Sequence, residues 1–361
     1  MIGPRASITI PPVTLNDNIY GKALSFDELY KSLKKCRRNV MWKDSVAGYS
    51  INALKNTYKL RQSLLKHTDK LDSYQIFRIN EPKEREIVAT RIKDRQFQRS
   101  LCDNVLYPEV TKSFVYDNCA CQRGKGVDFA LDRLNCHLQR HFRQHGLQGW
   151  ALQCDIRHFF AETPHTVAKA AIAKRVSCPE AIAHTDAIID SFGGDRGIGL
   201  GSQVSQITQL AVLDDLDHYI KERLRIKGYI RYMDDFLLIH PDRGYLERCL
   251  IDITAYLAAI GLELNKKTHI FPVSQGIVFL KWHFYLTATG KVIRKMSRKS
   301  ICRERRKLKK LKVLLDEGRI TMQDVHNNYQ SWRANAKRGN TRDLLLKMDE
   351  HYKNLFTRRK E

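Results

Sequence analysis

The stretch that decides the fold is Ile230-Arg-Tyr-Met-Asp-Asp-Phe-Leu-Leu-Ile239, in which two adjacent carboxylates stand between apolar flanks. Adjacent residues of a β-strand point to opposite faces, so Asp234 and Asp235 can reach one site only if the chain turns between them. The stretch therefore predicts a strand, a turn and a second strand. A carboxylate in a buried strand is costly unless it is paired or bound to a cation, which makes this turn a candidate metal site.

A third carboxylate, Asp155, ends another short apolar run, Trp150-Ala-Leu-Gln-Cys-Asp155. Three such carboxylates predict a centre for two Mg²⁺ ions, because this hard cation prefers carboxylate oxygens to thiols and imidazoles. Two ions roughly 3.5–4 Å apart can activate a hydroxyl group and neutralise a leaving pyrophosphate. An isolated Asp-Asp pair is more often a solvated turn, but the apolar flanks and Asp155 favour phosphoryl transfer.

The composition indicates a polyanionic partner. The 361 residues include 63 Lys and Arg against 39 Asp and Glu, a formal charge of +24. The hydrophobic content of 43% is ordinary for a globular protein. No apolar run approaches the roughly 20 residues of a membrane span, so no membrane partner is expected. The nine cysteines form no CxxC pair and the N-terminus lacks a signal segment, which predicts reduced thiols and a cytoplasmic location.

The positive charge is concentrated towards the C-terminus. Residues 291–361 hold 22 Lys and Arg against 8 Asp and Glu, and residues 303–315 place leucines at helical spacing among cations. This pattern predicts a basic helix that contacts nucleic-acid phosphates, with a solvated helix face as the alternative. Residues 25–71 also read as basic helices and begin with the spacing of a capping box. The candidate phosphate contacts of the C-terminal helix are Arg305, Lys309 and Lys312.

A second candidate for phosphate contact is Arg123-Gly-Lys-Gly126. Its glycines let the backbone approach a phosphate closely, and its two cations would bind one. We therefore predict that Arg123 and Lys125 bind nucleic acid, while an ordinary surface loop is an equally open interpretation.

Beyond these local patterns, the chain resembles the prokaryotic reverse transcriptases. Tyr232-Met-Asp-Asp235 is similar to their YxDD box, and the other motifs follow in the order of the family. Lys281 departs from the pattern, since the family usually has Gly at this place in the primer-grip turn. The matching segments are residues 114–126 for the finger motif, 155–160 and 164–165 for the first palm motif, 261–268 for the palm motif after the box, and 279–282 for the primer grip.

The resemblance implies roles for single residues. Asp155, Asp234 and Asp235 would be the catalytic metal ligands, and Phe160 would exclude a ribose 2′-hydroxyl. Two cations before the first palm motif are similar to those that hold the incoming triphosphate, although they also fit an exposed strand. A third resembles the palm lysine near the nucleotide phosphates. These cations are Lys83, Arg85 and Lys267.

The segment between the palm aspartates resembles a subfamily. Leu200-Gly-Ser-Gln-Val-Ser-Gln206 is similar to the enzymes of diversity-generating retroelements, where an aliphatic residue replaces a Gln and goes with error-prone copying of template adenines. Leu200, Gly201 and Gln206 would then shape the nascent base pair. Antiphage reverse transcriptases, which copy a partner non-coding RNA, share much of this architecture and are the alternative. A catalytically idle RNA-binding scaffold is disfavoured, because no metal aspartate is lost.

The resemblance also implies an α+β fold of the right-hand polymerase type. Its parts would be an N-terminal helical extension (1–75), fingers (76–150), a palm with a small antiparallel sheet (151–290) and a basic helical thumb (291–361). The expected partners are an RNA template, a nucleic-acid primer and dNTPs, with an accessory protein or a structured non-coding RNA as further candidates. No acidic cluster follows residue 290, so no nuclease domain is expected.

Overall fold

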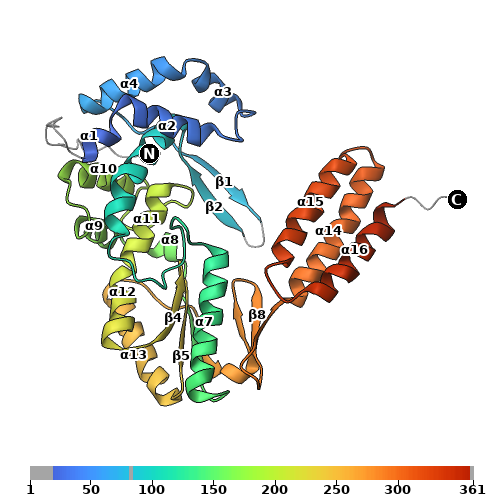
Figure 1. Ribbon diagram of the computed structural model, residues 1–361. Helices are drawn as coiled ribbons and strands as arrows, with labels where there is room; N and C mark the ends of the chain where they lie inside the picture. Colours follow the sequence, from blue (N-terminus) through green and yellow to red (C-terminus); the bar gives the residue numbers. More distant parts are fainter. Residues whose placement is uncertain (1–18, 81–83, 358–361) are drawn as a thin grey trace.

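The computed structural model describes residues 19–80 and 84–357 (Figure 1). Within these ranges helices surround three small antiparallel sheets, so the predicted α+β class is confirmed. Figure 1 shows the N-terminal helices and a hairpin at one end, a central sheet at the other, and a bundle of three helices to one side. No helix in the described part of the chain is both long and apolar enough to cross a membrane.

The N-terminal part consists of short helices and one hairpin. The hydroxyl of Ser25 accepts a hydrogen bond from the Glu28 N–H at 3.3 Å and so caps the first long helix, as its sequence predicts. We call the antiparallel pair of β1 (Gln75–Ile79) and β2 (Arg85–Ala89) the fingers hairpin. The helices are α1 (Ile19–Ala23), α2 (Phe26–Arg37), α3 (Asp44–Ile51), α4 (Ala53–Leu65), α5 (Ile92–Leu101), the π-helical turn η1 (Cys102–Leu106) and α6 (Tyr107–Val110).

The central sheet, here the palm sheet, contains the predicted strand–turn–strand. Its antiparallel order is β4-β5-β3-β6. The turn between β4 and β5 places Met233 in the left-handed conformation with φ 58°. Strand β3 has the same bounds as the apolar run Trp150–Asp155 that predicts it. The four strands are β3 (Trp150–Asp155), β4 (Gly228–Tyr232), β5 (Asp235–His240) and β6 (His269–Pro272).

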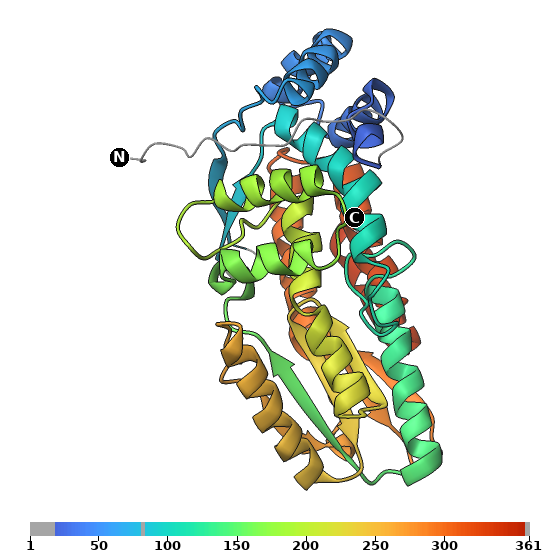
Figure 2. The same cartoon turned by 90° about the vertical axis from the view of Figure 1, so that its left-hand side faces the viewer.

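The palm sheet is buried on both faces. Leu152 and Phe236 belong to the core that contains α13 (Arg243–Ala259), whereas Ala151 and Leu237 belong to the core that contains α7 (Val127–His145). Figure 2 shows α13 and α7 on opposite sides of the sheet. Side chains alternate along a strand, so Asp155 and Asp235 share the α7 face with Ala151 and Leu237. The pattern that buries the apolar residues thus brings two carboxylates to one face.

The chain between β3 and β4 is helical and joins the N-terminal part to the palm. Helix α11 does this directly, because Leu210 lies in the core with the N-terminal helices and Val212 in the core under the palm sheet. The segments are α8 (Phe159–Glu162), α9 (His165–Ala173), α10 (Pro179–Asp190), α11 (Gln203–Val212), α12 (Asp214–His218) and the π-helical turn η2 (Tyr219–Arg223).

A three-stranded sheet leads to the three-helix thumb bundle. The 3₁₀ turn η3 (Val273–Gln275) precedes β7 (Ile277–Phe279), β8 (Trp282–Leu286) and β9 (Val292–Met296), which we call the grip sheet. Leu280 and Lys281 turn from β7 to β8 with φ 49° and 72°, so Lys281 adopts a conformation that normally favours Gly. The thumb bundle is α14 (Arg298–Asp316), α15 (Met322–Ala336) and α16 (Arg342–Phe356).

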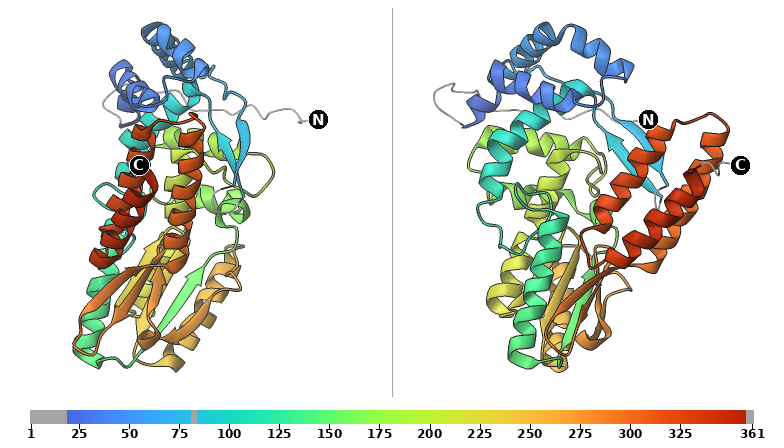
Figure 3. Two further views of the ribbon diagram at one scale, coloured as in Figure 1. Left: turned by 90° about the vertical axis from the view of Figure 1, so that its right-hand side faces the viewer. Right: turned by 45° about the vertical axis from the view of Figure 1, so that its right-hand side comes forward.

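The thumb bundle contains the basic helix that residues 303–315 predict, as part of α14. Its small core is Leu308, Tyr329 and Met348, and the Tyr329 hydroxyl donates to Asp349 at 2.6 Å. Tyr329 stacks on Trp332 of its own helix at a centroid distance of 5.9 Å and on Tyr352 of α16 at 4.3 Å, so Tyr329 packs between helices. Figures 1 and 3 show α15 as the thumb helix nearest to the fingers hairpin and α16 on the outer side.

Candidate active site

Three carboxylates gather at the end of β3 and at the β4–β5 turn. Asp155 is the register partner of Asp235, and Asp234 immediately precedes β5. Two backbone hydrogen bonds hold this arrangement: Ile156 N–H donates to the Asp234 carbonyl at 3.3 Å, and Asn265 N–H donates to the Asp155 carbonyl at 2.7 Å. Residues directly opposite in antiparallel strands have Cβ atoms roughly 4.5–5.5 Å apart, so Asp155 and Asp235 can share one cation.

These carboxylates are half-buried, and their negative charges repel one another. Burial raises the pKa of Asp235 to about 7, and the charges of Asp155 and Asp234 add to the rise. A hydrogen bond from the Gln153 amide to Asp235, 3.4 Å long, opposes it. Burial, together with the charge of Asp155, also raises the pKa of Asp234. Like charges held close in a buried site are stabilised when a cation lies between them.

The donor set fits a divalent cation such as Mg²⁺. This ion takes oxygen ligands, keeps several waters and is usually bound through one or two carboxylates plus substrate phosphates. Asp155 and Asp235 offer carboxylate oxygens from neighbouring strands. In the described ranges there is no group of three or more His, Cys, Asp and Glu side chains placed to hold a metal ion.

A buried ion pair that sequence reasoning missed supports the turn. The guanidinium of Arg231 donates to both carboxylate oxygens of Asp217 at 2.6 and 2.5 Å, and both side chains are completely buried. Its Nη1 donates to the Met233 carbonyl at 3.1 Å. A left-handed residue other than Gly costs about 1–2 kcal/mol, so this bond helps to hold the turn that carries Asp234. The signal was available: an Arg within an apolar strand requires a partner.

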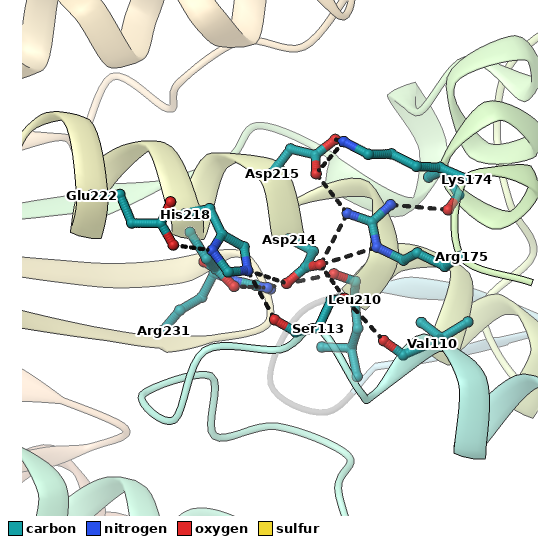
Figure 4. Close-up of polar contacts among 12 residues, drawn as sticks. Val110, Ser113, Lys174, Arg175, Leu210, Asp214, Asp215, His218, Glu222 and Arg231 are labelled. Carbon is teal, nitrogen blue, oxygen red and sulfur yellow. Dashed lines mark hydrogen bonds and ion pairs between the residues drawn. The ribbon is translucent and has the colours of Figure 1, made fainter.

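Two further sets of contacts hold Asp217 in place, one to its side chain and one to its helix, α12. The hydroxyl of Tyr229 donates to Asp217 at 2.5 Å. A second network anchors the start of α12, as Figure 4 shows. There Arg175 contacts Asp214 at 2.9 Å and the adjacent Asp215 at 2.8 Å. The position of the YxDD turn therefore depends on a chain of polar contacts that reaches well outside the palm sheet.

Leu200 and Gly201 lie against the fingers hairpin. The Val88 N–H of β2 donates to the Leu200 carbonyl at 3.0 Å. Gly201 has φ 134°, and a Cβ there would lie 3.1 Å from the Val88 carbonyl oxygen, so a Gly is required for this close approach. Arg85 begins β2, and its charge lowers the pKa of Asp234 against the effect of burial. The structure thus brings Arg85 into the electrostatic field of the carboxylates.

The other residues predicted to contact the nucleotide are spread around this centre. Phe160 is half-buried, and its ring meets Phe159 edge-on at a centroid distance of 6.0 Å. Gln206 is half-buried on α11, and Lys267 is exposed in the loop before β6. Lys83 lies outside the described residues. The roles of these four predicted residues stay predictions.

The cations predicted to bind nucleic acid have different surroundings. The ammonium group of Lys125 donates to two backbone carbonyls at 3.0 and 2.9 Å, so it is engaged within the protein. Arg123 is exposed, with its guanidinium 4.7 Å from the centre of the Tyr107 ring. Three further cations lie on α14 of the thumb bundle, and one of them pairs with Asp316: they are Arg305, Lys309 and Lys312.

The chain is similar to known polymerases. A family model described as reverse transcriptase (RNA-dependent DNA polymerase) matches residues 51–284. A search of curated proteins finds no match. Among solved structures, telomerase from Candida albicans, in complex with a TWJ fragment of telomeric RNA, has 14% identity and a TM-score of 0.47, covering 63% of this chain and 46% of that chain. Apo telomerase from Candida tropicalis, truncated from the C-terminal domain, has 13% identity and a TM-score of 0.47, and the match covers 61% of this chain and 54% of that chain. This chain spans about half the length of these structures.

Proposed function

The chain belongs to the reverse transcriptase family of RNA-dependent DNA polymerases, and on that premise we propose that Asp155, Asp234 and Asp235 are its catalytic carboxylates. The enzyme is an RNA-directed DNA polymerase with a right-hand fold, and its family implies an RNA template and a primer. The observation that carries the proposal is the register of the palm sheet, which sets Asp155 opposite Asp235 and next to Asp234 in the turn.

The proposed cofactor is a pair of Mg²⁺ ions, since reverse transcriptases generally use divalent metals. Two ions, when bound, supply activation of the primer 3′-hydroxyl and neutralisation of the leaving pyrophosphate. Asp155 and Asp234 would bind them, and Asp235 would support the binding. The raised pKa values of Asp234 and Asp235 support this assignment, because burial and mutual repulsion disfavour uncompensated charge.

Around this centre we assign the substrate contacts. Arg85 would attract the dNTP triphosphate, as would Lys83 and Lys267, and the Phe160 ring would stand where a 2′-hydroxyl collides. Leu200, Gly201 and Gln206 would shape the nascent pair. The corresponding division of the chain is an N-terminal extension to residue 75, fingers to 150, a palm to 290 and a thumb beyond.

Within the family, we favour error-prone cDNA synthesis of a diversity-generating retroelement. The support is Leu200, an aliphatic side chain whose backbone is tied to β2 of the fingers hairpin. Copying of a non-coding RNA in antiphage defence is the alternative. The neighbouring DNA distinguishes the two: a near-identical repeat pair that differs at adenines favours diversification, and a structured RNA gene beside defence genes favours the alternative.

The decisive experiment replaces Asp234 by Asn in the full chain. Incorporation of dNTPs on a primed RNA template with Mg²⁺ should fall at least about a hundredfold, since the metals contribute several kcal/mol to the transition state. Affinity for the primed template should hardly change, because the phosphates are bound by cations elsewhere. The matched control is Asp252→Asn, an exposed carboxylate on α13 that should leave incorporation intact. Undiminished incorporation by the Asp234 variant would overturn the assignment.

A further inference from the structure

A groove rich in positive charge runs between α14 and α16 on the thumb bundle. Four cations line it, together with a single acidic residue, Glu350. None of the four cations has an ion pair with any residue in the described part of the chain, in contrast to Arg333 of the same bundle, which is bound by Asp349 at 2.9 Å. The residues that line this α14–α16 groove are Cys302, Arg305, Arg306, Lys309, Lys347, Glu350, His351 and Asn354.

The positive charges of the groove affect the histidine that lines it, His351. The pKa of His351 is lowered, first by burial and then by the charges of Arg305 and Lys309. The Nε2 atom of His351 is buried and has no hydrogen-bond partner in the described residues. Four cations beside a single acidic residue favour an anionic ligand. The backbone positions of Arg305 and Lys309 are four residues apart, which is about 6 Å along the helix axis.

The groove lies on the opposite flank of α14 from the primer-grip turn. Ser300 lines a hollow that also contains Leu280 and Lys281 of the β7–β8 turn. Arg305 and Lys309 follow Ser300 by five and nine residues, which places them about 140° and 180° around the helix. Figures 1 and 3 show α16, which forms the other wall of the groove, on the side of the bundle away from the fingers hairpin.

We propose that the α14–α16 groove binds the phosphate backbone of an RNA segment that lies outside the primer–template duplex. The inference rests on the proposed function, because the RNA would be the template that this polymerase copies. The groove presents two Arg and two Lys to the ligand, the side chains that bind phosphate oxygens through charge and hydrogen bonds. A groove of this kind would retain a particular RNA on the enzyme while its duplex part moves through the polymerase.

The test compares two triple variants of the full chain that carry equal charge changes on the same bundle. The groove variant is Arg305→Glu, Lys309→Glu and Lys347→Glu. The matched variant is Arg303→Glu, Lys307→Glu and Lys310→Glu, all exposed and on the other flank of α14. The probes are a minimal DNA-primed RNA template and the same template continued as RNA beyond the 5′ end of the primer.

The groove variant should lose at least tenfold in affinity for the extended probe and keep its affinity for the minimal one. The slope of log affinity against log salt on the extended probe should fall by about 2, because each lost contact with a single strand removes roughly 0.7. The matched variant should show no such difference between probes. A third triple variant, Arg305→Lys, Lys309→Arg and Lys347→Arg, keeps the three positive charges and should bind both probes like the wild type.

Two results would overturn the inference. If the groove variant loses equal affinity for both probes, the groove binds the duplex itself. If its affinity for both probes is unchanged, the groove faces a protein partner or solvent. Alkylation of the exposed Cys302 gives a second readout in the wild type, since the extended probe should slow it more than the minimal probe does. Primer extension on the minimal probe by the wild type and by the Asp234→Asn variant tests the proposed function separately, because this probe has no RNA beyond the 5′ end of the primer.

Discussion

Arg231 stands in a strand of apolar residues, and Asp217 compensates its charge in place of water. The same guanidinium donates to the Met233 carbonyl, so the backbone that precedes Asp234 depends on a side chain that is completely buried. A buried ion pair is not in itself strong evidence for stability, since desolvation of both charges offsets much of their attraction. We therefore regard Arg231 as a positioning residue for the turn.

Replacing Arg231 by Lys should lower kcat at least tenfold with little change in affinity for the primed template. Lysine keeps the charge but lacks the planar fork that holds Asp217 and the Met233 carbonyl together. The control is Tyr229→Phe, which removes one hydrogen bond to Asp217 and leaves the Met233 contact. It should cost about 1–2 kcal/mol in free energy of unfolding without a comparable loss of kcat. Equal losses of kcat in both variants would assign the effect to stability. Steady-state kinetics and urea unfolding measure both quantities.

Leu200→Gln should lower misincorporation, most visibly opposite template adenine. An aliphatic side chain makes no hydrogen bond to a nascent pair, whereas one such bond contributes about 0.5–1.5 kcal/mol, or several-fold to roughly tenfold in selectivity. The backbone of Leu200 should keep its bond to Val88, so activity should survive. Sequencing of cDNA made on one defined RNA by both enzymes measures the error spectrum. Equal adenine error rates at comparable activity would refute the mechanism.

At the scale of elements, the fingers hairpin packs closely against the segment of residues 199–201. The Val88 N–H of β2 donates to the Leu200 carbonyl. A Cβ at Gly201 would lie 3.1 Å from the Val88 carbonyl oxygen, so β2 would have to shift slightly to admit it. Arg85 begins that strand, so a displaced hairpin would also move this cation away from the carboxylates. Hairpin position and nucleotide affinity should therefore change together.

Gly201→Ala tests this coupling and should raise the KM for dNTPs several-fold. The Cβ would lie 3.1 Å from the Val88 carbonyl oxygen and 3.3 Å from the Ile87 side chain. Gly193→Ala is the matched control: it also has positive φ, at 80°, but no atom within 4 Å of its Cβ. It should lose only about 1 kcal/mol in free energy of unfolding through backbone strain and keep its KM. An unchanged KM in the Gly201 variant would show that the docking does not govern nucleotide binding.

At the scale of the whole molecule, buried acids make stability depend on pH, and Asp94 is one that lies away from the candidate active site. Burial raises the pKa of Asp94 in α5 to about 6, although the Asp72 N–H donates to its carboxylate at 2.7 Å. The ordinary value for Asp is about 3.9, so the folded protein binds this proton more tightly than the unfolded chain. The contribution of Asp94 to stability is therefore full below about pH 4 and is lost as pH rises to about 6.

Asp94→Asn should raise the free energy of unfolding at pH 7 by about 1–2 kcal/mol, because the amide is neutral and its oxygen can still accept from Asp72. The gain should vanish below pH 4. The exposed Asp252→Asn serves as the control and should show no such pH dependence. Urea unfolding from pH 4 to 8 measures the difference between each variant and the wild type. A constant difference across that range would contradict the assignment of the raised pKa.

The sequence by itself determined the elements with a clear period and the order of the family motifs. The apolar flanks of Asp234 and Asp235 predicted β4, the turn and β5, and the run that ends at Asp155 predicted β3. Leucines at helical spacing predicted α14. These patterns are local, because each strand or helix records in its own residues which face is buried. The motifs indicated the family for the same reason, since each is a short stretch of sequence that can be recognised without knowing which residues lie near it in space.

Only the tertiary structure decided which distant side chains meet. Arg231 finds Asp217 because α12 packs beside β4, and neither residue signals the other in the sequence. Lys125, predicted to bind phosphate, donates to the backbone carbonyls of Tyr116 and Asn118, which its own sequence does not indicate. Leu308 fixes the inward face of α14, but the helix that covers each flank depends on how the bundle packs. Such contacts join segments far apart in the chain, so their energies depend on packing that no local pattern records.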